Sequence, residues 1–413
     1  MTKKSDAPAI RFKGFSDAWE QRKLGELVDR VVRKNTNNES TLPLTISAQY
    51  GLVDQITYFN NRVASRDVSN YYLVLNGEFA YNKSTSDGYP FGAVKRLDLY
   101  EKGVLSTLYI VFAPKKEQQI DSDYLTVFFD TDRWHKGVAE RAAEGARNHG
   151  LLNISAEDFF DIDLSVPKDI VEQKQIGAFI RQLDNLITLH QRKFEKLTNV
   201  KKSMLEKMFP QNGSSYPEIR FKGFTDPWEQ RKVSDLAEKT YGGGTPTTSN
   251  EAYWNGDIPW IQSSDVVDGK LLGVEPRKWI TQDGLNNSAA QLIPGNSIAI
   301  ITRVGVGKLA FMPYSYATSQ DFLSLSKLNA EPLFTVYACY KKLQSELNAV
   351  QGTSIKGITK DELLAKNIMV PRYAEQQQIG AFFKQLDHLI TLHQRELEKL
   401  QNIKKSMLEK MFV

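Results

Sequence analysis

The sequence predicts an α+β fold in which two mixed α/β domains are separated by two long helices that form an antiparallel coiled coil. Two internal repeats predict it. Residues Glu172–Phe209 and Glu375–Phe412 agree at 30 of 38 aligned positions, and Ile10–Lys23 recurs as Ile219–Lys232 with two changes. The segments between these copies differ in sequence. The chain therefore has two variable modules within a duplicated frame, which implies internal pseudo-two-fold symmetry.

The repeats divide the 413 residues into four parts. We expect one domain over residues 1–165, a conserved region with a long helix over 166–210, a second domain over 211–369 and a second conserved helical region over 370–413. This length is sufficient for two or three separate cores. The segment 210–218, rich in Pro, Gly and Ser, is typical of a flexible joint between the halves.

The modules contain β-branched and alternating apolar runs that indicate strands. In the first module, the expected elements are strands over Tyr71–Asn82 and Val104–Pro114 and a helical stretch over Tyr124–Ala143. In the second module, they are strands over Ile258–Val267, Ser297–Pro313 and Phe322–Leu328 and a helix over Leu333–Ala349. Each module ends in a Gly-containing loop, a short helix and a strand that finishes in Val-Pro. We therefore expect the same fold in both modules.

Both 38-residue repeats carry a heptad stripe, which requires a partner helix. At about 1.5 Å per residue each helix is about 57 Å long, and its near-copy is the simplest partner. The expected coiled-coil core is Ile180, Leu183, Ile187, His190 and Leu197 in one helix and Phe383, Leu386, Ile390, His393 and Leu400 in the other.

His190 and His393 lie near the midpoints of their helices, so antiparallel pairing is expected to bring the two imidazoles together near the local two-fold axis. A polar layer that fixes the register is the favoured interpretation. A metal site or a proton relay is the other one.

Composition favours a soluble protein with a binding role. The net charge of +4 permits a nucleic-acid partner without requiring one. Cys339 is the single cysteine, which excludes a disulfide framework and a thiolate metal site. No apolar run is long enough for a membrane span, and the first residues do not resemble a signal peptide. We expect a cytoplasmic protein with no membrane partner.

Catalytic motifs are not evident. The run Gly305–Leu309 lacks the spacing of a phosphate loop, and the five histidines lack the spacing of a metal site. No nucleophile elbow and no paired acid and base are recognisable. The run Tyr241–Thr248, YGGGTPTT, is either a flexible turn or a backbone loop that lies against a phosphate. We predict a non-catalytic protein without a metal or a cofactor of its own.

Two unlike modules held in a rigid frame suit a long repeating partner such as double-stranded DNA, since related modules can enter grooves about one helical turn apart. Amide, hydroxyl and basic side chains in the loops are the residue types that read base edges. The DNA-binding candidates are Gln49, Asn82, Lys83, Ser84, Arg147 and Asn148 in the first module and Gly243, Thr245, Gln262, Ser263, Thr302, Arg303, Ser319, Gln320 and Lys356 in the second.

Several motifs carry a family resemblance. They are the boxes FKGFSDAWEQRKLGEL and FKGFTDPWEQRKVSDL, the W-x-G-x-I-P-W run at Trp254–Trp260 and the two EQxxIGxFxxxLDxLIxLHQR helices. Together they resemble the specificity subunit of bacterial Type I restriction-modification systems over nearly the whole chain. The module interiors carry no motif that assigns a base contact to a particular residue.

The resemblance implies a host-defence role without chemistry in this chain. Residues 1–165 and 211–369 would be target recognition domains that read the halves of a bipartite, asymmetric DNA site, and the helices would set the unread spacer. Two modification subunits, which bind S-adenosylmethionine and methylate adenine N6, would dock on the helices. Two restriction subunits can join to give an ATP-dependent translocating nuclease, so ATP and Mg are also expected in partner subunits.

Six lysines on the helices either dock partners or are simply solvated, and we favour the solvated interpretation. They are Lys201, Lys202, Lys207, Lys404, Lys405 and Lys410. A non-catalytic coiled-coil adaptor that binds two protein partners is the alternative function. An enzyme that acts on DNA by itself is disfavoured by the missing motifs.

Overall fold

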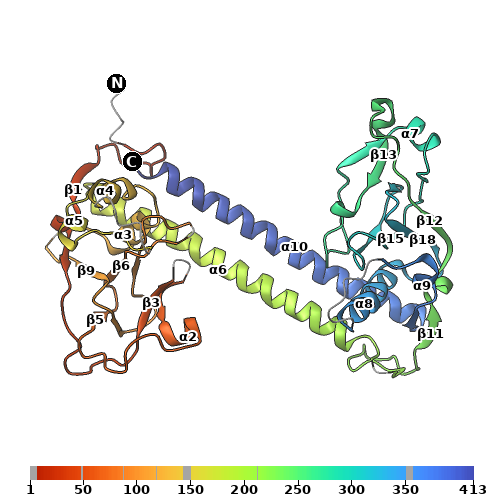
Figure 1. The fold of residues 1–413 in the computed structure, drawn as a ribbon, viewed down its shortest axis with the longest axis horizontal. Helices are drawn as coiled ribbons and strands as arrows, with labels where there is room; N and C mark the ends of the chain where they lie inside the picture. Colours follow the sequence, from red (N-terminus) through yellow and green to blue (C-terminus); the bar gives the residue numbers. More distant parts are fainter. Residues whose placement is uncertain are drawn as a thin grey trace. The chain divides into compact units, whose positions relative to one another are not determined.

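The computed structural model describes residues 7–47, 50–86, 88–117, 119–142, 150–211, 213–349 and 357–413. The chain forms two compact units (Figure 1). Unit 1 contains Met1–Leu189 and Leu397–Val413, and unit 2 contains His190–Glu396. Each unit holds one module and parts of both long helices. The predicted limits of the four parts stay a prediction.

Unit 1 is a mixed α/β module. Its strands are β1 (Glu20–Lys23), β2 (Val28–Arg30), β3 (Leu44–Ser47), β4 (Gly51–Asp54), β5 (Tyr72–Leu75), β6 (Phe79–Asn82), β7 (Ala93–Arg96), β8 (Lys102–Leu105), β9 (Ile110–Pro114) and β10 (Asp163–Val166). Its short helices are α1 (Leu24–Leu27), α2 (Gln55–Phe59), α3 (Ser122–Phe129), α4 (His135–Arg141) and α5 (Ala156–Phe160).

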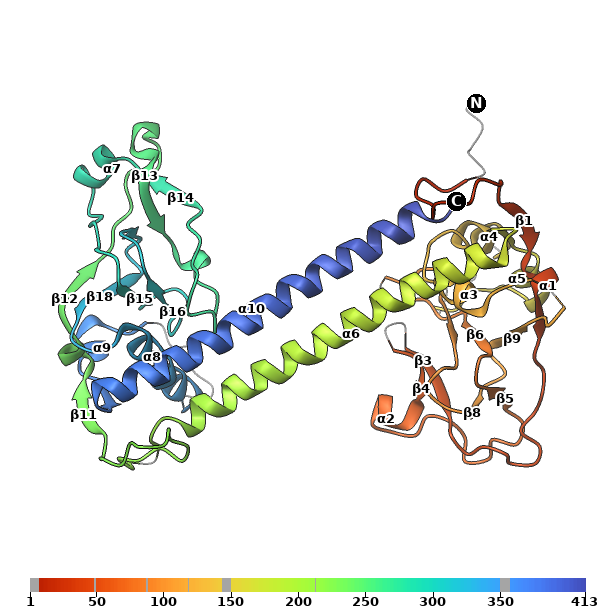
Figure 2. The same cartoon turned by 180° about the vertical axis from the view of Figure 1, so that it is seen from behind.

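The main sheet of unit 1 is antiparallel, in the order β2-β9-β6-β7, and β1 pairs with β10. Its strands β6 and β9 are labelled in Figure 2. An aromatic core fills the space between this sheet and the helices. Phe79 stacks on Phe112 with ring centroids 5.3 Å apart, and Tyr81 stacks on Phe159 at 4.4 Å. The expected helical stretch over Tyr124–Ala143 is divided into α3 and α4 in its described part.

Unit 2 has the same kind of module. Its strands are β11 (Glu229–Lys232), β12 (Ala237–Gly242), β13 (Trp254–Ile261), β14 (Lys278–Ile280), β15 (Ser297–Ile301), β16 (Leu309–Met312), β17 (Ala317–Thr318), β18 (Phe322–Leu328) and β19 (Asn367–Val370). Its helices are η1 (Val233–Leu236), η2 (Glu251–Tyr253), η3 (Ser263–Asp265), α7 (Gln282–Asn286), α8 (Pro332–Ala349) and α9 (Lys360–Leu364).

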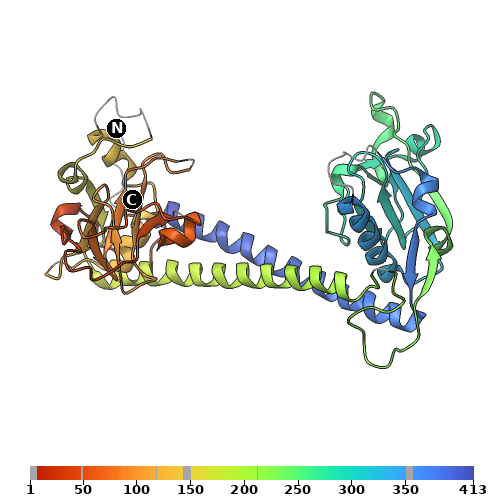
Figure 3. The same ribbon diagram turned by 60° about the horizontal axis from the view of Figure 1, so that its bottom comes forward.

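The main sheet of unit 2 is antiparallel in the order β12-β18-β15-β16, which repeats the arrangement of β2-β9-β6-β7. β11 pairs with β19, as β1 pairs with β10. Helix α8 packs against β15 and β16 (Figure 3). The expectation of one fold in two modules is confirmed for these strands. The run expected as one strand over Ser297–Pro313 is the β15-β16 hairpin.

The long helices are α6 (Ile170–Lys207) and α10 (Tyr373–Lys410), and they lie side by side (Figures 1 and 2). The structure gives the burial of each predicted core position. Ile180, Leu183, Phe383 and Leu386 are buried, and the remaining six are partly buried. Contacts within each unit show that the helices run antiparallel, because the C-terminal part of one meets the N-terminal part of the other. None of the described helices combines the length and apolarity needed to cross a bilayer.

Two lysines at core positions correct the expectation of solvated lysines. In unit 2, Lys201 of α6 forms an ion pair with Asp387 of α10 at 2.6 Å. In unit 1, Lys404 of α10 forms the equivalent pair with Asp184 of α6 at 2.7 Å. Burial of Lys404 opposes its charge, but the nearby carboxylates outweigh that effect and raise its pKa. A lysine in a helix seam is stable only when it is paired, so these two cations fix the register of the helices.

The duplicated boxes hold the helix ends. Glu172 at the start of α6 is buried and receives two hydrogen bonds from Arg11, at 2.6 and 2.7 Å. Glu375 at the start of α10 receives two from Arg220, both at 2.8 Å. Losing one partner of such a buried pair typically costs about 3–5 kcal/mol. The box and the helix repeat therefore recur together because their side chains bond each other.

The boxes also contact the helix that ends beside them. In unit 2, the N–H of Ile219 donates to the carbonyl of Lys207 at 2.9 Å, within one continuous run of chain. In unit 1, the N–H of Ile10 donates to the carbonyl of Lys410 at 3.0 Å, across the two ends of the chain. The same junction is thus built once with a covalent connection and once without it.

The predicted meeting of the two central histidines is confirmed. The Nδ1 atoms of His190 and His393 lie 3.2 Å apart in unit 2. When both rings are neutral, one N–H donates to the lone pair of the other. Desolvation, His190 and Lys193 together hold the pKa of His393 below its ordinary value of 6.5.

This dyad predicts a specific pH dependence. At His393 the unfolded chain takes up a proton before the folded chain does as the pH falls below about 6.5, so acidification lowers the free energy of unfolding through this residue. We expect the double variant His190→Leu/His393→Leu to gain stability relative to the native chain as the pH falls from 7.5 to 5.5. Urea unfolding midpoints measured across that range test this. The exposed His388→Asn is the control, and an identical pH slope in the double variant and the native chain would contradict the expectation.

Candidate nucleic-acid interface

Three strands of unit 2 end at the same edge of the module. β12 ends at Gly242, opposite Leu323 at the start of β18, and β15 ends at Ile301, opposite Phe322. β13 ends beside the parallel strand β17, where Ile261 is level with Thr318. The loops that follow these strands therefore meet the turn before β18. We call this edge, with residues 242–245, 262–265, 302–308 and 318–321, the loop end of unit 2.

Hydrogen bonds join the predicted candidates at this loop end. Thr245 Oγ1 donates to Gln320 Oε1 at 2.7 Å. The N–H of Ser319 donates to the carbonyl of Ile261 at 2.9 Å, next to Gln262 and Ser263.

A second set of bonds fastens the β15-β16 turn to the same place. The N–H and the hydroxyl of Thr302 both donate to the carbonyl of Asp321, at 2.8 and 3.1 Å. The N–H of Ile358 donates to the carbonyl of Thr302 at 2.8 Å. The eight described candidates of the second module are thus brought together. Lys356 lies outside the described residues.

Exposure separates these eight residues by what they can contact. Thr302 and Ser319 are buried and use their polar atoms inside the module. Gly243, Gln262 and Ser263 are half-buried. Thr245, Arg303 and Gln320 are exposed, so their side chains are the ones that can reach a ligand.

The glycine run Gly242–Gly244 has a packing role that neither sequence interpretation anticipated. A Cβ added at Gly243 would lie 1.9 Å from the carbonyl oxygen of Ser319, and one at Gly244 would lie 2.3 Å from a backbone carbon of Ala289. The backbone therefore crosses other segments closely at Gly243 and Gly244, whereas a side chain at Gly242 would meet open space. Its proximity to a phosphate stays a prediction.

The described candidates of the first module, Asn82, Lys83 and Ser84, lie where β6 ends. Asn82 Oδ1 accepts the N–H of Ser84 at 3.0 Å. The Lys83 ammonium donates to the carbonyl of Ile154 at 3.2 Å, which makes this lysine a brace for the segment after the loop. Gln49, Arg147 and Asn148 lie outside the described residues.

The sequence did not point to the turn before β9 as a functional segment. This turn, Ser106–Tyr109, precedes β9, the second strand in the order of its sheet. In the same way, Ser319–Asp321 precedes β18, the second strand of the other sheet. Thr107 is exposed there, in the place of Gln320. An alignment of VLSTLYIVF (Val104–Phe112) with ATSQDFLSL (Ala317–Leu325) carries a signal that could have found this turn, because it sets Ser106 and Thr107 against Ser319 and Gln320.

The described parts of both modules offer hydrogen-bonding groups without a catalytic arrangement. No group of three or more His, Cys, Asp or Glu side chains gathers there in a way that could hold a metal ion. In the interior of the unit 2 module, burial raises the pKa of Tyr316 to about 12, and its hydroxyl lies between Ser297 and Ser324. Such a neutral hydroxyl chain supports the module rather than a reaction.

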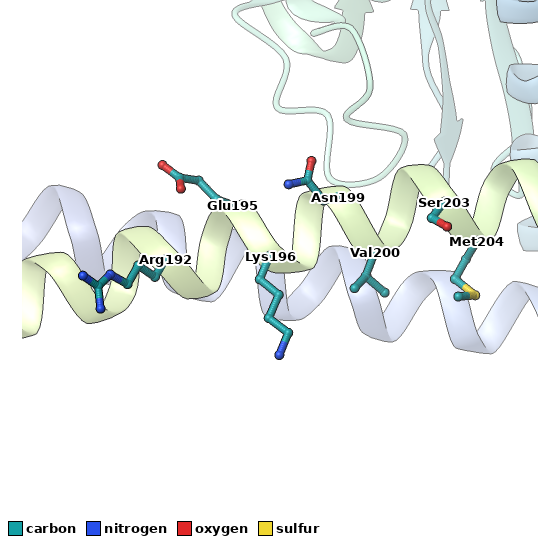
Figure 4. A pocket seen from close by; sticks show the side chains of 7 residues that line it. All are labelled: Arg192, Glu195, Lys196, Asn199, Val200, Ser203 and Met204. Carbon is teal, nitrogen blue, oxygen red and sulfur yellow. The ribbon is translucent and has the colours of Figure 1, made fainter. Parts of the chain in front are cut away.

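A second surface feature lies on α6. An open depression on this helix in unit 2 is lined by Arg192, Glu195, Lys196, Asn199, Val200, Ser203 and Met204 (Figure 4). The second repeat carries the same residue types 203 positions later, with Ile403 in place of Val200.

Comparison with known proteins gives a consistent family. The family described as the Type I restriction modification DNA specificity domain matches residues 17–199 and again 225–402. The putative Type I restriction enzyme MjaX specificity subunit of Methanocaldococcus jannaschii is 22% identical over 410 residues, which cover 94% of this chain and 92% of that protein.

Two further similarities agree with it. The Type I restriction enzyme MjaIX specificity subunit of the same organism is 28% identical over 193 residues, or 45% of this chain and 44% of that one. The crystal structure of the Type I restriction-modification S subunit from M. genitalium is similar in fold, with a TM-score of 0.61 at 13% identity over 98% of this chain and 99% of that chain.

The family assignment agrees with the duplicated strand framework, the paired helices and the two sets of polar loops. The assignment decides against the alternative that the whole chain is a coiled-coil adaptor for two protein partners. Members of the family carry no cofactor of their own. The chain belongs to the DNA specificity subunits of Type I restriction-modification systems, and it is a non-catalytic subunit with two target recognition domains.

Proposed function

We propose that each recognition domain reads one half of a bipartite, asymmetric duplex site through its loop end. The observation that carries the proposal is the repeated sheet, which ends in different polar loops in the two units. In unit 2 the exposed groups among the described candidates are an amide, a hydroxyl and a guanidinium, from Gln320, Thr245 and Arg303. Amides and guanidinium groups are the side chains that most often read base edges in the major groove. Because the two domains carry different loops on the same strand framework, we expect the two half-sites to differ in base sequence.

The long helices set the unread spacer in this proposal. Each is an uninterrupted helix of 38 residues. The paired lysines and aspartates prevent one helix from sliding along the other, because a slip of one residue would leave Lys201 and Lys404 without their carboxylates. A fixed register is what a constant number of unread base pairs requires.

The same helices carry docking sites for two methyltransferase subunits. Leu186 and Leu189 of α6 are 41% and 45% exposed, and Leu389 and Leu392 of α10 are 40% and 45% exposed. These leucines are equivalent in the two repeats, as are the residues that line the depression in Figure 4. Two equivalent apolar sites favour two identical partners. Restriction subunits that use ATP and Mg would join the resulting complex, in the cytoplasm.

Exchange of one module tests the reading of half-sites. Replacing residues 24–165 with the module of another specificity subunit is expected to change one half of the methylated site and to leave the other half intact. The readout is the position of methylated adenines across the genome of a host that expresses the chain with its methyltransferase subunit. Changes in both half-sites after this exchange would contradict independent reading, and scattered methylation by the native chain would contradict the proposed function.

Lengthening both helices tests the spacer. One heptad added to each helix near its midpoint adds about 10 Å, which corresponds to about three base pairs. We expect the methylated site to keep both half-sites and to gain about three unread positions. Two alanine-rich heptads of equal length with different surface residues serve as matched inserts. An unchanged gap would show that the helices do not set it.

Replacing an exposed leucine with a charged residue tests the docking of methyltransferase subunits. Burial of a leucine typically contributes about 1.5–3 kcal/mol, so Leu189→Glu or Leu392→Glu should weaken one of the two sites at least tenfold. Native mass spectrometry is expected to show one bound methyltransferase subunit for each single variant and none for the double variant. Thr188→Glu, which is exposed and lies about 100° around the helix from Leu189, is the control. A double variant that still binds two subunits would place the docking site elsewhere.

A further inference from the structure

Lys201 of α6 contacts more than the facing helix. Its Nζ atom lies 2.6 Å from Asp387 Oδ1, and it also donates to the carbonyl of Gly269 in the recognition module, at 3.0 Å. The other oxygen of Asp387 is bound to the module too, because the hydroxyl of Tyr337 on α8 donates to it at 2.6 Å. The two charged side chains are only 11% and 15% exposed. This cluster therefore joins α6, α10 and the module of unit 2.

The donors and acceptors of this cluster have a single assignment. A lysine ammonium can only donate a hydrogen bond, and a backbone carbonyl or an ionised carboxylate can only accept one. Burial and the negative charge of Asp387 raise the pKa of Tyr337 above its ordinary value of 10, so its hydroxyl keeps its proton and donates to the carboxylate. The chemistry of both groups therefore specifies each contact.

The contact with the module lies close to the loop end. Gly269 comes four residues after the loop-end segment 262–265. Two residues further on, the carbonyl of the buried Leu271 accepts the N–H of Phe311 in β16 at 2.9 Å. Lys201 thus holds a segment that connects a recognition loop to the main sheet.

Unit 1 contains an equivalent cluster with different groups from its module. Lys404 and Asp184 are the repeat equivalents of the first pair, and they lie 2.7 Å apart. Lys404 also lies 3.5 Å from Asp130, which follows α3, and Asp130 Oδ1 accepts from Lys95 of β7 at 2.7 Å. β7 pairs with β6, the strand that leads to the candidates of the first module. Two modules of different sequence thus supply acceptors to the same lysine position of the frame.

We propose that Lys201 and Lys404 are positioning residues that fix each recognition domain at one place along the helix pair, so that the DNA site has a single gap length. The inference rests on the proposed function and extends it, because it assigns the gap to the attachment of the domains as well as to the length of the helices. Apolar contacts between a module and the helices are non-directional, whereas a buried polar contact selects one register.

Distances and hydrogen-bond energies indicate how strict this selection is. Adjacent base pairs are about 3.4 Å apart along the duplex. Displacement of the module by that amount would break the 3.0 Å contact between Lys201 and Gly269, since hydrogen bonds of this kind extend to about 3.2 Å. A hydrogen bond to a charged group biases an equilibrium by about tenfold or more. The clusters can therefore discriminate between gaps that differ by one base pair.

The test uses the full chain in complex with its methyltransferase subunits. Duplexes carry both half-sites with the native gap or with a gap one base pair shorter or longer, and competition binding gives the preference for the native gap. The double variant Lys201→Met/Asp387→Leu is expected to lower this preference by about tenfold or more. Its thermal unfolding midpoint should stay the same or rise, because well-packed apolar residues can replace a buried ion pair without loss of stability. A purely structural role does not predict a lost preference in a stable chain.

Two milder variants separate the attachment of a module from the pairing of the helices. Tyr337→Phe removes the hydroxyl that binds Asp387, and Lys95→Met removes the ammonium that binds Asp130, while the ion pair between the helices remains in each unit. Each variant should lower the preference by about two- to tenfold. Lys202→Met, an exposed position next to Lys201, is the matched control and should keep the native preference.

The outcomes separate three failures. A native preference in the stable double variant would overturn the proposal, and if that variant loses stability, Tyr337→Phe and Lys95→Met decide. A native preference in both milder variants would show that the lysines act through the helix register alone, which would overturn their role in attachment. If the native complex binds duplexes of all three gap lengths equally, or prefers no sequence, the proposed function itself fails.

Discussion

The structure depends on the need to cover two heptad stripes. A 38-residue amphipathic helix cannot leave its apolar seam in water, and here the two near-identical helices cover each other in antiparallel pairing. That pairing brings the start of each helix beside the end of the other, within reach of one duplicated box. Arg11 and Arg220 then neutralise the buried carboxylates of Glu172 and Glu375. The helices, the boxes and the registers are consequences of one packing requirement.

Much of the fold was predictable, because it follows from periodicity. Apolar residues at heptad spacing gave the two helices and their core, and the equivalent midpoints of the repeats gave the meeting of His190 and His393. The prediction of solvated lysines was wrong for Lys201 and Lys404. A charged residue in an apolar stripe shows that a partner is needed, but the carboxylate lies on another helix and depends on the register, which a single sequence does not show.

The loop end was predictable only as a set of residue types. The clustering of Gly243, Ser319 and Thr302 depends on strand pairs between distant segments, such as Gly242 with Leu323 and Ile301 with Phe322. Loop sequences do not reveal such pairs, since loops vary while the framework holds them. The same reason explains why the exposed turn at Thr107 was missed. A polar residue that stabilises the module, such as Lys83, cannot be told from a ligand-binding residue in the sequence. Its hydrogen bond to the carbonyl of Ile154 is visible only in the structure.

The junction formed by Ile10 and Lys410 has a consequence for how the polypeptide can be connected. Its counterpart, between Ile219 and Lys207, has the same backbone hydrogen bond within an unbroken stretch of chain. The position of the termini is therefore one of two equivalent choices. Consider a circularly permuted polypeptide in which the present ends are joined and the chain is opened within the 210–218 joint. It would keep the contacts of both boxes, and the two recognition domains would only exchange their order along the chain.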